Sequence, residues 1–154
     1  MGVISIKDFE INDEEIFISM AHLFYETGMI CNKINPGFLQ KTYFNCISNS
    51  PYVRGVFICY DDEISGYALL TFTYSNEYGG KIMEIDEIYI KDEFREKGIA
   101  NDFVSTIIAE YRHDVTYVEV VVMKDNIAAL KLCEKHGFIA NDYIAMHKTL
   151  YVNA

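Results

Sequence analysis

Apolar positions recur with two different periods along the chain, and these periods predict the order of its helices and strands. Apolar side chains three and four residues apart are typical of one-sided helices, whereas short runs rich in β-branched residues are typical of strands. The predicted helices cover residues 12–25, 36–48, 99–111 and 126–136. The predicted strands cover residues 3–9, 55–60, 65–74, 81–90, 117–122 and 143–150.

Capping residues mark where several of these elements begin and end. Asn12 followed by Glu15 resembles a capping box at the start of the first helix. Pro36 suits the first position of the second helix, and Gly137 is placed to cap the last one. A loop is expected over residues 27–34.

The predicted order is β-α-α-β-β-β-α-β-α-β, in one domain that spans residues 1–154. Asp61-Asp62-Glu63 and Gly79-Gly80 mark tight turns between the three middle strands, so these strands are expected to form an antiparallel meander. A fully parallel Rossmann sheet would alternate strand and helix throughout, and the meander argues against it. The fold class is therefore α/β with a mixed, mostly antiparallel sheet.

Charge and composition exclude several classes of function. Thirteen basic and 23 acidic residues give a net charge of −10, and no basic patch for nucleic acid is visible. No apolar run approaches the roughly 20 residues that span a bilayer, so we expect no membrane segment. The four cysteines and four histidines lack the spacing of metal ligands. We therefore expect no metal site, and a reducing cytoplasm is the simplest location.

The segment Arg95-Glu96-Lys97-Gly98-Ile99-Ala100 joins a predicted strand to the start of a clean amphipathic helix. A glycine turn that opens a helix exposes unpaired backbone N–H groups at the positive end of the helix dipole, which suits a phosphate. The alternative is an ordinary strand-to-helix loop that uses Gly98 for its turn. Arg95 and Lys97 add positive charge to an otherwise acidic region and favour the anion site.

Four motifs in order give the chain its resemblance to the GNAT superfamily of acyl-CoA-dependent N-acetyltransferases. They are the strand Ile88-Tyr89-Ile90, the loop Arg95-x-x-Gly98-x-Ala100, the helix start Asn126-x-x-Ala129-x-x-Leu132 and the terminating Gly137-Phe138. The resemblance covers about residues 55–150. It implies a central sheet with helices on both faces, acetyl-CoA as the cofactor, a homodimer and an N-acetyltransferase activity.

The resemblance also implies which residues hold coenzyme A. The pyrophosphate would lie on the loop, and the pantetheine arm would follow main-chain groups of the strand that ends at Ile90. The implied cofactor-binding residues are Ile88, Tyr89, Ile90, Arg95, Glu96, Lys97, Gly98, Ile99, Ala100, Asn101, Asn126, Ala129 and Cys133.

Three acids precede the loop and are candidates for the base that deprotonates the amine. Strict alternation places Glu84 and Asp86 on one face of the strand and Glu87 on the other, although a bulge would break this parity. In the resemblance, Glu84 aligns with the base of the histone-type enzymes, and Asp86-Glu87 aligns with the acidic pair of polyamine acetyltransferases. We rank Glu87 first, then Asp86, then Glu84, against the alternative of solvated surface acids.

One position departs from the family pattern. Cys133 stands where the family often has a tyrosine that protonates the departing thiolate. Its thiol is a candidate general acid, and the alternative is a small buried hydrophobe. Tyr143 is a second candidate for this role.

The acceptor is expected to be a small cationic amine. Tyr25, Glu26 and Asp86 are the predicted substrate-binding residues, because acids beside aromatic rings suit an alkyl ammonium. The sequence resembles the polyamine and diamine group most, and an aminoglycoside-like amine also fits. Two alternatives are an enzyme acting on a protein N-terminus or lysine, and a module that binds acyl-CoA without turnover.

Overall fold

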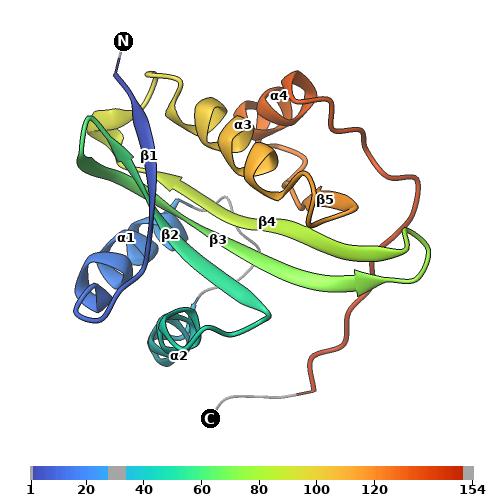
Figure 1. The fold of residues 1–154 in the computed structure, drawn as a ribbon, viewed down its shortest axis with the longest axis horizontal. Helices are drawn as coiled ribbons and strands as arrows, with labels where there is room; N and C mark the ends of the chain where they lie inside the picture. Colours follow the sequence, from blue (N-terminus) through green and yellow to red (C-terminus); the bar gives the residue numbers. More distant parts are fainter. Residues whose placement is uncertain (1, 28–33, 151–154) are drawn as a thin grey trace.

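The computed structural model describes residues 2–27 and 34–150, which form a five-stranded sheet flanked by helices (Figure 1). The strands are β1 (Ile4–Asp8), β2 (Val53–Tyr60), β3 (Glu63–Ser75), β4 (Gly80–Ile90) and β5 (Tyr117–Val120). The helices are α1 (Glu14–Glu26), α2 (Pro36–Ile47), α3 (Ile99–Tyr111) and α4 (Ile127–Lys135), with a 3₁₀ turn η1 (Asp92–Phe94). Most of the predicted loop over residues 27–34 lies outside the described residues.

The sheet has the order β1-β2-β3-β4-β5. The first four strands pair antiparallel in sequence, and β5 joins β4 in parallel, which confirms the mixed sheet and its central meander. Gly66 on β3 explains how closely β3 and β4 approach. A Cβ atom there would lie 2.0 Å from the carbonyl oxygen of Tyr89, so only glycine fits this position.

Each face of the sheet packs against its own helices, as predicted. One core contains Phe17 of α1 and Tyr43 of α2 beneath α1 and α2. The other contains Phe103 and Ile107 of α3, whose spacing of four residues matches the helical period. Figure 1 shows α1 and α2 on one side of the sheet and α3 and α4 on the other. These two apolar layers hold the middle of β4 between them, and the three acids lie on that strand.

A β-bulge breaks the alternation of β4 at the acids. Glu87 pairs with Leu69 and Ile85 pairs with Leu70, so Asp86 has no partner residue in this ladder. As a result, Ile85 and Ile88 both pack toward α3, although they are three residues apart. Glu84 and Glu87 therefore share the opposite face of β4, toward α1. Strict alternation would have put them on different faces, so the structure has the bulge that the sequence left open as the alternative.

Two predicted boundaries differ from the structure. The first helix begins after Asp13 and not after Asn12, because Asn12 has a left-handed φ of 82° and belongs to the preceding turn. The proposed capping box is therefore wrong. The predicted strand 117–122 ends at Val120, and Val121 is exposed. The other predicted helix ends agree with the structure. At the start of α2, the Asn35 side chain accepts a 2.9 Å hydrogen bond from the Gly37 N–H, and Gly137 adopts a left-handed φ of 78° after α4.

The last predicted strand, residues 143–150, is absent from the structure. These residues form no strand, and the large apolar side chains among them are exposed. The alternating sequence is compatible with a strand, but no neighbouring strand pairs with it in the described parts of the chain. Separately, no helix within residues 2–27 and 34–150 is long and apolar enough to cross a membrane.

Candidate active site

Glu87 is a buried carboxylate held by two tyrosines. Its side chain is 7% exposed, and it accepts hydrogen bonds of 2.6 Å from the Tyr25 hydroxyl and 2.7 Å from the Tyr67 hydroxyl. Burial raises the pKa of Glu87, while the two hydrogen bonds act to lower it. Burial first, and then the contact with Glu87, raises the pKa of Tyr25 and of Tyr67, so both hydroxyls stay protonated donors.

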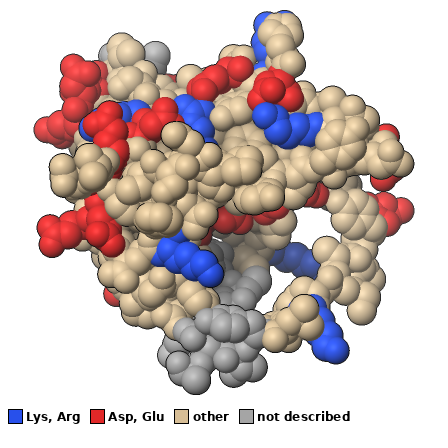
Figure 2. Space-filling view, turned by 60° about the horizontal axis from the view of Figure 1, so that its bottom comes forward, with Lys and Arg blue, Asp and Glu red and all other residues tan. Residues whose placement is uncertain are grey.

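Asp86 occupies the bulge and faces solvent, beside Glu87 and Glu84. Partial burial of its carboxyl raises the pKa of Asp86. Glu84 is half-buried, and its pKa is raised first by burial and then by the negative charges of Asp86 and Glu119. Figure 2 shows a hollow on one face of the molecule, with acidic side chains along its upper edge and basic side chains on either side of it. The three predicted acids thus form one cluster with shared electrostatics.

The strands β4 and β5 separate next to this cluster. Their parallel pairing runs from Ile82 with Tyr117 to Ile85 with Val120 and stops there. Beyond it, β4 continues for another five residues, paired only with β3 among the described strands. The β5-side edge of β4 after Ile85 therefore has no partner strand among those described, and its main-chain groups are open to an extended ligand, as the resemblance implies.

The loop before α3 has the geometry expected of an anion cradle. Gly98 is the N-cap of α3, with φ 76°, and nothing lies within 4 Å of the position that its Cβ would take. The N–H groups of Ile99, Ala100 and Asn101 belong to the first helical turn, which has no intrahelical acceptors for them. The open space at Gly98 and these donors fit a pyrophosphate of coenzyme A.

The two cations of this loop, Arg95 and Lys97, contact neighbouring groups of the protein. The Arg95 guanidinium donates a 3.1 Å hydrogen bond to the Ile90 carbonyl and forms a 3.0 Å ion pair with Asp92. The Lys97 ammonium lies 5.4 Å from the ring centre of Tyr60. Glu96 adopts a left-handed φ of 60° and completes the turn. Both cations belong to the loop that leads to Gly98, and Asp92 offsets the charge of Arg95.

The helix α4 contributes a cap and a half-buried thiol. The Asn126 side chain accepts a 3.2 Å hydrogen bond from the Ala129 N–H, so its observed role is to cap the helix. His136 and Asn101 lie within 3.1 Å of each other, which ties the end of α4 to the start of α3. Cys133 lines a groove between α4 and β5, and burial raises the pKa of its thiol.

Two residues near the site are not predicted by the sequence pattern. Tyr67 was not predicted, because its contact with Glu87 depends on the register that pairs it with Tyr89, two residues beyond Glu87. Glu119 was not predicted either, although its pairing with Glu84 brings a fourth carboxylate to the cluster. The predicted Glu26 is exposed at the end of α1. Tyr143 donates a 3.0 Å hydrogen bond to Glu119.

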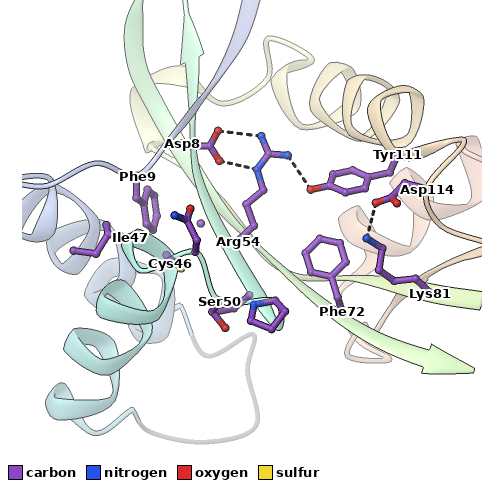
Figure 3. A pocket seen from close by; sticks show the side chains of 14 residues that line it. Asp8, Phe9, Cys46, Ile47, Ser50, Arg54, Phe72, Lys81, Tyr111 and Asp114 are labelled. Carbon is purple, nitrogen blue, oxygen red and sulfur yellow. Dashed lines mark hydrogen bonds and ion pairs between the residues drawn. The ribbon is translucent and has the colours of Figure 1, made fainter.

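A separate hollow of about 430 Å³ lies between α2, β2 and the end of α3 (Figure 3). Its charged groups neutralise one another. Arg54 forms ion pairs with Asp8 at 2.7 Å and with Glu110 at 2.6 Å, and Lys81 is paired with Asp114. The residues that line it include none of the predicted site residues, so we assign it a structural role.

Comparison with solved structures identifies the fold. The chain is similar to a possible acetyltransferase from Clostridium difficile 630, with 20% identity over 98% of this chain and 99% of that one and a TM-score of 0.81. It is similar to the aminoglycoside N-acetyltransferase AAC(6')-Iy in complex with CoA, with 10% identity, coverage of 98% and 97% and a TM-score of 0.75.

A third similar structure is a ribosomal-protein-alanine N-acetyltransferase from Brucella melitensis, with 13% identity, coverage of 96% and 100% and a TM-score of 0.72. No curated protein matches the chain in sequence. The model of the acetyltransferase (GNAT) family, whose members use acetyl-CoA, matches residues 19–138. The chain therefore belongs to the GNAT acetyltransferase family.

Proposed function

We propose that this protein transfers an acetyl group from acetyl-CoA to the primary amine of a small cationic substrate. The observation that carries the proposal is the cluster of Glu84, Asp86 and Glu87 at the point where β4 and β5 separate. Four carboxylates, including Glu119, attract a polycation to the place where the family's thioester is expected. Acetyl-CoA supplies the activated acetyl group.

The cofactor would be held by the loop before α3 and by β4. The first-turn N–H groups of α3 face the open space at Gly98 and suit the pyrophosphate. The free edge of β4 after Ile85 suits the amide-bearing arm. Both features follow the acids along the chain, which supports an acyl end of the cofactor beside the carboxylates.

Glu87 anchors the substrate in this proposal. Its two tyrosine donors fix the carboxylate and favour its charged form, which then attracts an ammonium group. Tyr25 adds an aromatic face beside that charge. Because Glu87 is buried and both of its oxygens are already hydrogen-bonded, we assign it a holding role and not the first place as base.

Asp86 is the proton acceptor in this proposal. An alkyl ammonium with a pKa near 10.4 must lose a proton before it attacks, which costs about 4–5 kcal/mol at pH 7. Asp86 faces solvent at the bulge, and its raised pKa makes it a better base than an ordinary aspartate. Glu84 shares its face of β4 with Glu87 and supports the negative field.

Cys133 is the candidate proton donor for the departing thiolate. Its pKa is raised by burial, so the thiol is protonated at neutral pH and carries a proton to give. A Cys133→Ser variant, which keeps a small polar group, tests this role. A loss in kcat with an unchanged KM for acetyl-CoA supports it, and unchanged kcat shows that Cys133 is a packing residue.

Thiol release from acetyl-CoA with a panel of amines tests the proposed acceptor. The panel holds linear polyamines, diamines, aminoglycosides, and peptides with a free N-terminus or a lysine. We expect the highest kcat/KM with a small polycation. Preference for a peptide would support the protein acetyltransferase, and CoA binding without release for any amine would support a binding module. Location in the cytoplasm stays a prediction.

A further inference from the structure

Arg54 on β2 ties the last turn of α3 to the sheet. Its guanidinium donates hydrogen bonds of 2.7 and 3.3 Å to the two carboxylate oxygens of Asp8, at the end of β1. It donates two more, of 2.6 Å to the Glu110 carboxylate and of 3.0 Å to the Tyr111 hydroxyl, and Figure 3 shows it between Asp8 and Tyr111. Glu110 and Tyr111 are the last two residues of α3, so one side chain joins β1, β2 and this helix.

These contacts are stronger than those of an ordinary surface ion pair. The Arg54 side chain is only 23% exposed, and an arginine that bonds both oxygens of a carboxylate holds the two groups in one geometry. The guanidinium also lies 5.8 Å from the ring centre of Tyr111, which in turn lies 5.4 Å from the ring centre of Phe72 on β3. The end of α3 is therefore held from three strands.

The sequence of α3 does not itself supply a cation at this end. Its last turn contains Glu110 and no basic residue, which is the reverse of the charge that the helix dipole favours there. Arg54 supplies the positive charge from β2. We therefore expect the position of this helix end to depend on Arg54.

The middle of α3 is held by apolar contacts. Apolar packing is favourable but non-directional, so it restrains a slide along the helix axis less than hydrogen bonds of fixed geometry do. Among the described residues, α3 makes side-chain hydrogen bonds to other elements only at its ends, with Arg54 at the last turn and through Asn101 with His136 at the first. Gly98, its N-cap, has no side chain to fix that end.

The helix transmits its position from one end to the other. α3 has 13 residues, which makes it a rod of about 20 Å. A slide of its last turn moves the N–H groups of its first turn by the same distance. A misplacement of about 1 Å far from the chemistry can cost about 100-fold in rate. The contacts at Glu110 and Tyr111 are therefore relevant to what binds at Gly98.

We propose that Arg54 is a positioning residue for the cofactor. By holding Glu110 and Tyr111 against β1 and β2, it sets the place along the axis of α3 at which the first-turn N–H groups meet the pyrophosphate. This role rests on the proposed function, which places the pyrophosphate at that turn. It extends the structural role of the hollow in Figure 3 to the affinity for coenzyme A.

Calorimetric titration of CoA into Arg54→Met tests this role. The variant loses the charged contacts and keeps an unbranched apolar chain, and we expect a dissociation constant at least fivefold above that of the wild type. Lys81→Met is the matched control, because it removes the other ion pair of the same hollow, whose partner Asp114 lies beyond the end of α3. Its affinity should stay that of the wild type. A loss of folded protein alone would lower the number of sites per chain and not the affinity.

Glu110 provides a second, milder test in case Arg54→Met does not fold. Glu110→Ala removes the helix side of the contact and leaves Arg54 paired with Asp8, so it should also weaken CoA binding. Glu110→Gln keeps an oxygen that accepts the hydrogen bond and should restore most of the affinity.

The His136 ring reports the position of the first turn without any cofactor, because its Nε2 lies 3.1 Å from Oδ1 of Asn101. Its NMR signals should shift in Arg54→Met and in Glu110→Ala, and keep their wild-type positions in Lys81→Met. Unmoved signals would overturn the proposal, and so would unchanged CoA affinity in Arg54→Met and Glu110→Ala. In the latter case, weakened binding by Gly98→Glu would trace the failure to the role of Arg54, whereas unchanged binding would trace it to the proposed place of the pyrophosphate.

Discussion

Tyr25 on α1 donates a 2.6 Å hydrogen bond to Glu87 on β4, 62 residues further along the chain. This bond fixes the end of the first helix against the acidic bulge of the sheet. The position of the buried charge therefore depends on the first helix, which is part of the acceptor site in the proposed reaction. Tyr67 completes the arrangement from β3, so three elements hold one carboxylate.

Removal of the Tyr25 hydroxyl should move the pH dependence of the reaction. This hydrogen bond lowers the pKa of Glu87, so Tyr25→Phe should raise that pKa and shift the acidic limb of kcat/KM to higher pH. One hydrogen bond of about 1 kcal/mol corresponds to a shift of about one pH unit. Tyr74→Phe, an exposed tyrosine on the β3–β4 hairpin, is the matched control. An acidic limb of kcat/KM that stays at the same pH would show that the charge of Glu87 has no part in the reaction.

The effect of Glu87→Gln on the free energy of unfolding should depend on pH. The folded state raises the pKa of Glu87 above 4.5, so the stabilisation by its proton is complete below pH 4.5 and is lost as pH rises through the folded pKa. Glutamine stays neutral throughout. The free energy of unfolding of the variant minus that of the wild type should therefore increase from pH 4 to pH 7, as measured by denaturant titration. A difference that falls over this range would contradict the raised pKa.

Substitution of Asp86 and substitution of Glu87 should affect different kinetic constants. Asp86→Asn should lower kcat by about 10²–10⁴-fold, the range for loss of a general base, with little change in KM for the amine. Glu87→Gln should instead raise that KM. Glu84→Gln should cost less than about tenfold in kcat, because its proposed role is only to add to the negative field. A larger loss in kcat for Glu84→Gln than for Asp86→Asn would reverse the assignment.

Gly98→Glu should weaken CoA binding by more than tenfold. The new carboxylate would lie at the helix N-terminus where the pyrophosphate is proposed, in a position whose φ of 76° already disfavours side chains. Gly79→Glu is a close control, since Gly79 has φ 68° and equally open space but lies in the β3–β4 turn. Calorimetric titration of CoA into both variants compares them. Equal affinities would place the pyrophosphate elsewhere.

The helices and strands were predictable where one periodicity dominated. The helix over Ile99–Tyr111 was predicted to the residue, because its apolar stripe packs on the sheet as the pattern requires. The meander followed from its turn residues. The family motifs were also local, so the glycine turn at Gly98 that opens α3 was found from the sequence.

The parts that failed depend on contacts between distant segments. The segment over residues 143–150 has the sequence pattern of a strand, but a strand also needs a second strand to pair with, and none is described beside it. Asn12 resembled a cap until the turn before α1 gave it a left-handed φ. Tyr67 reaches Glu87 only through the β3–β4 register. The β-bulge determines on which face of β4 the Glu87 side chain lies. Alternation of side chains along the sequence does not show where such a bulge occurs.

Mass spectrometry of a polyamine after incubation with acetyl-CoA and the full chain tests directly whether the protein acetylates a small cationic amine. We expect a small polyamine to gain one acetyl group in the presence of the wild type, and Asp86→Asn to slow formation of this product at least a hundredfold under the same conditions. An unmodified polyamine with wild type that is shown to bind CoA would contradict this expectation.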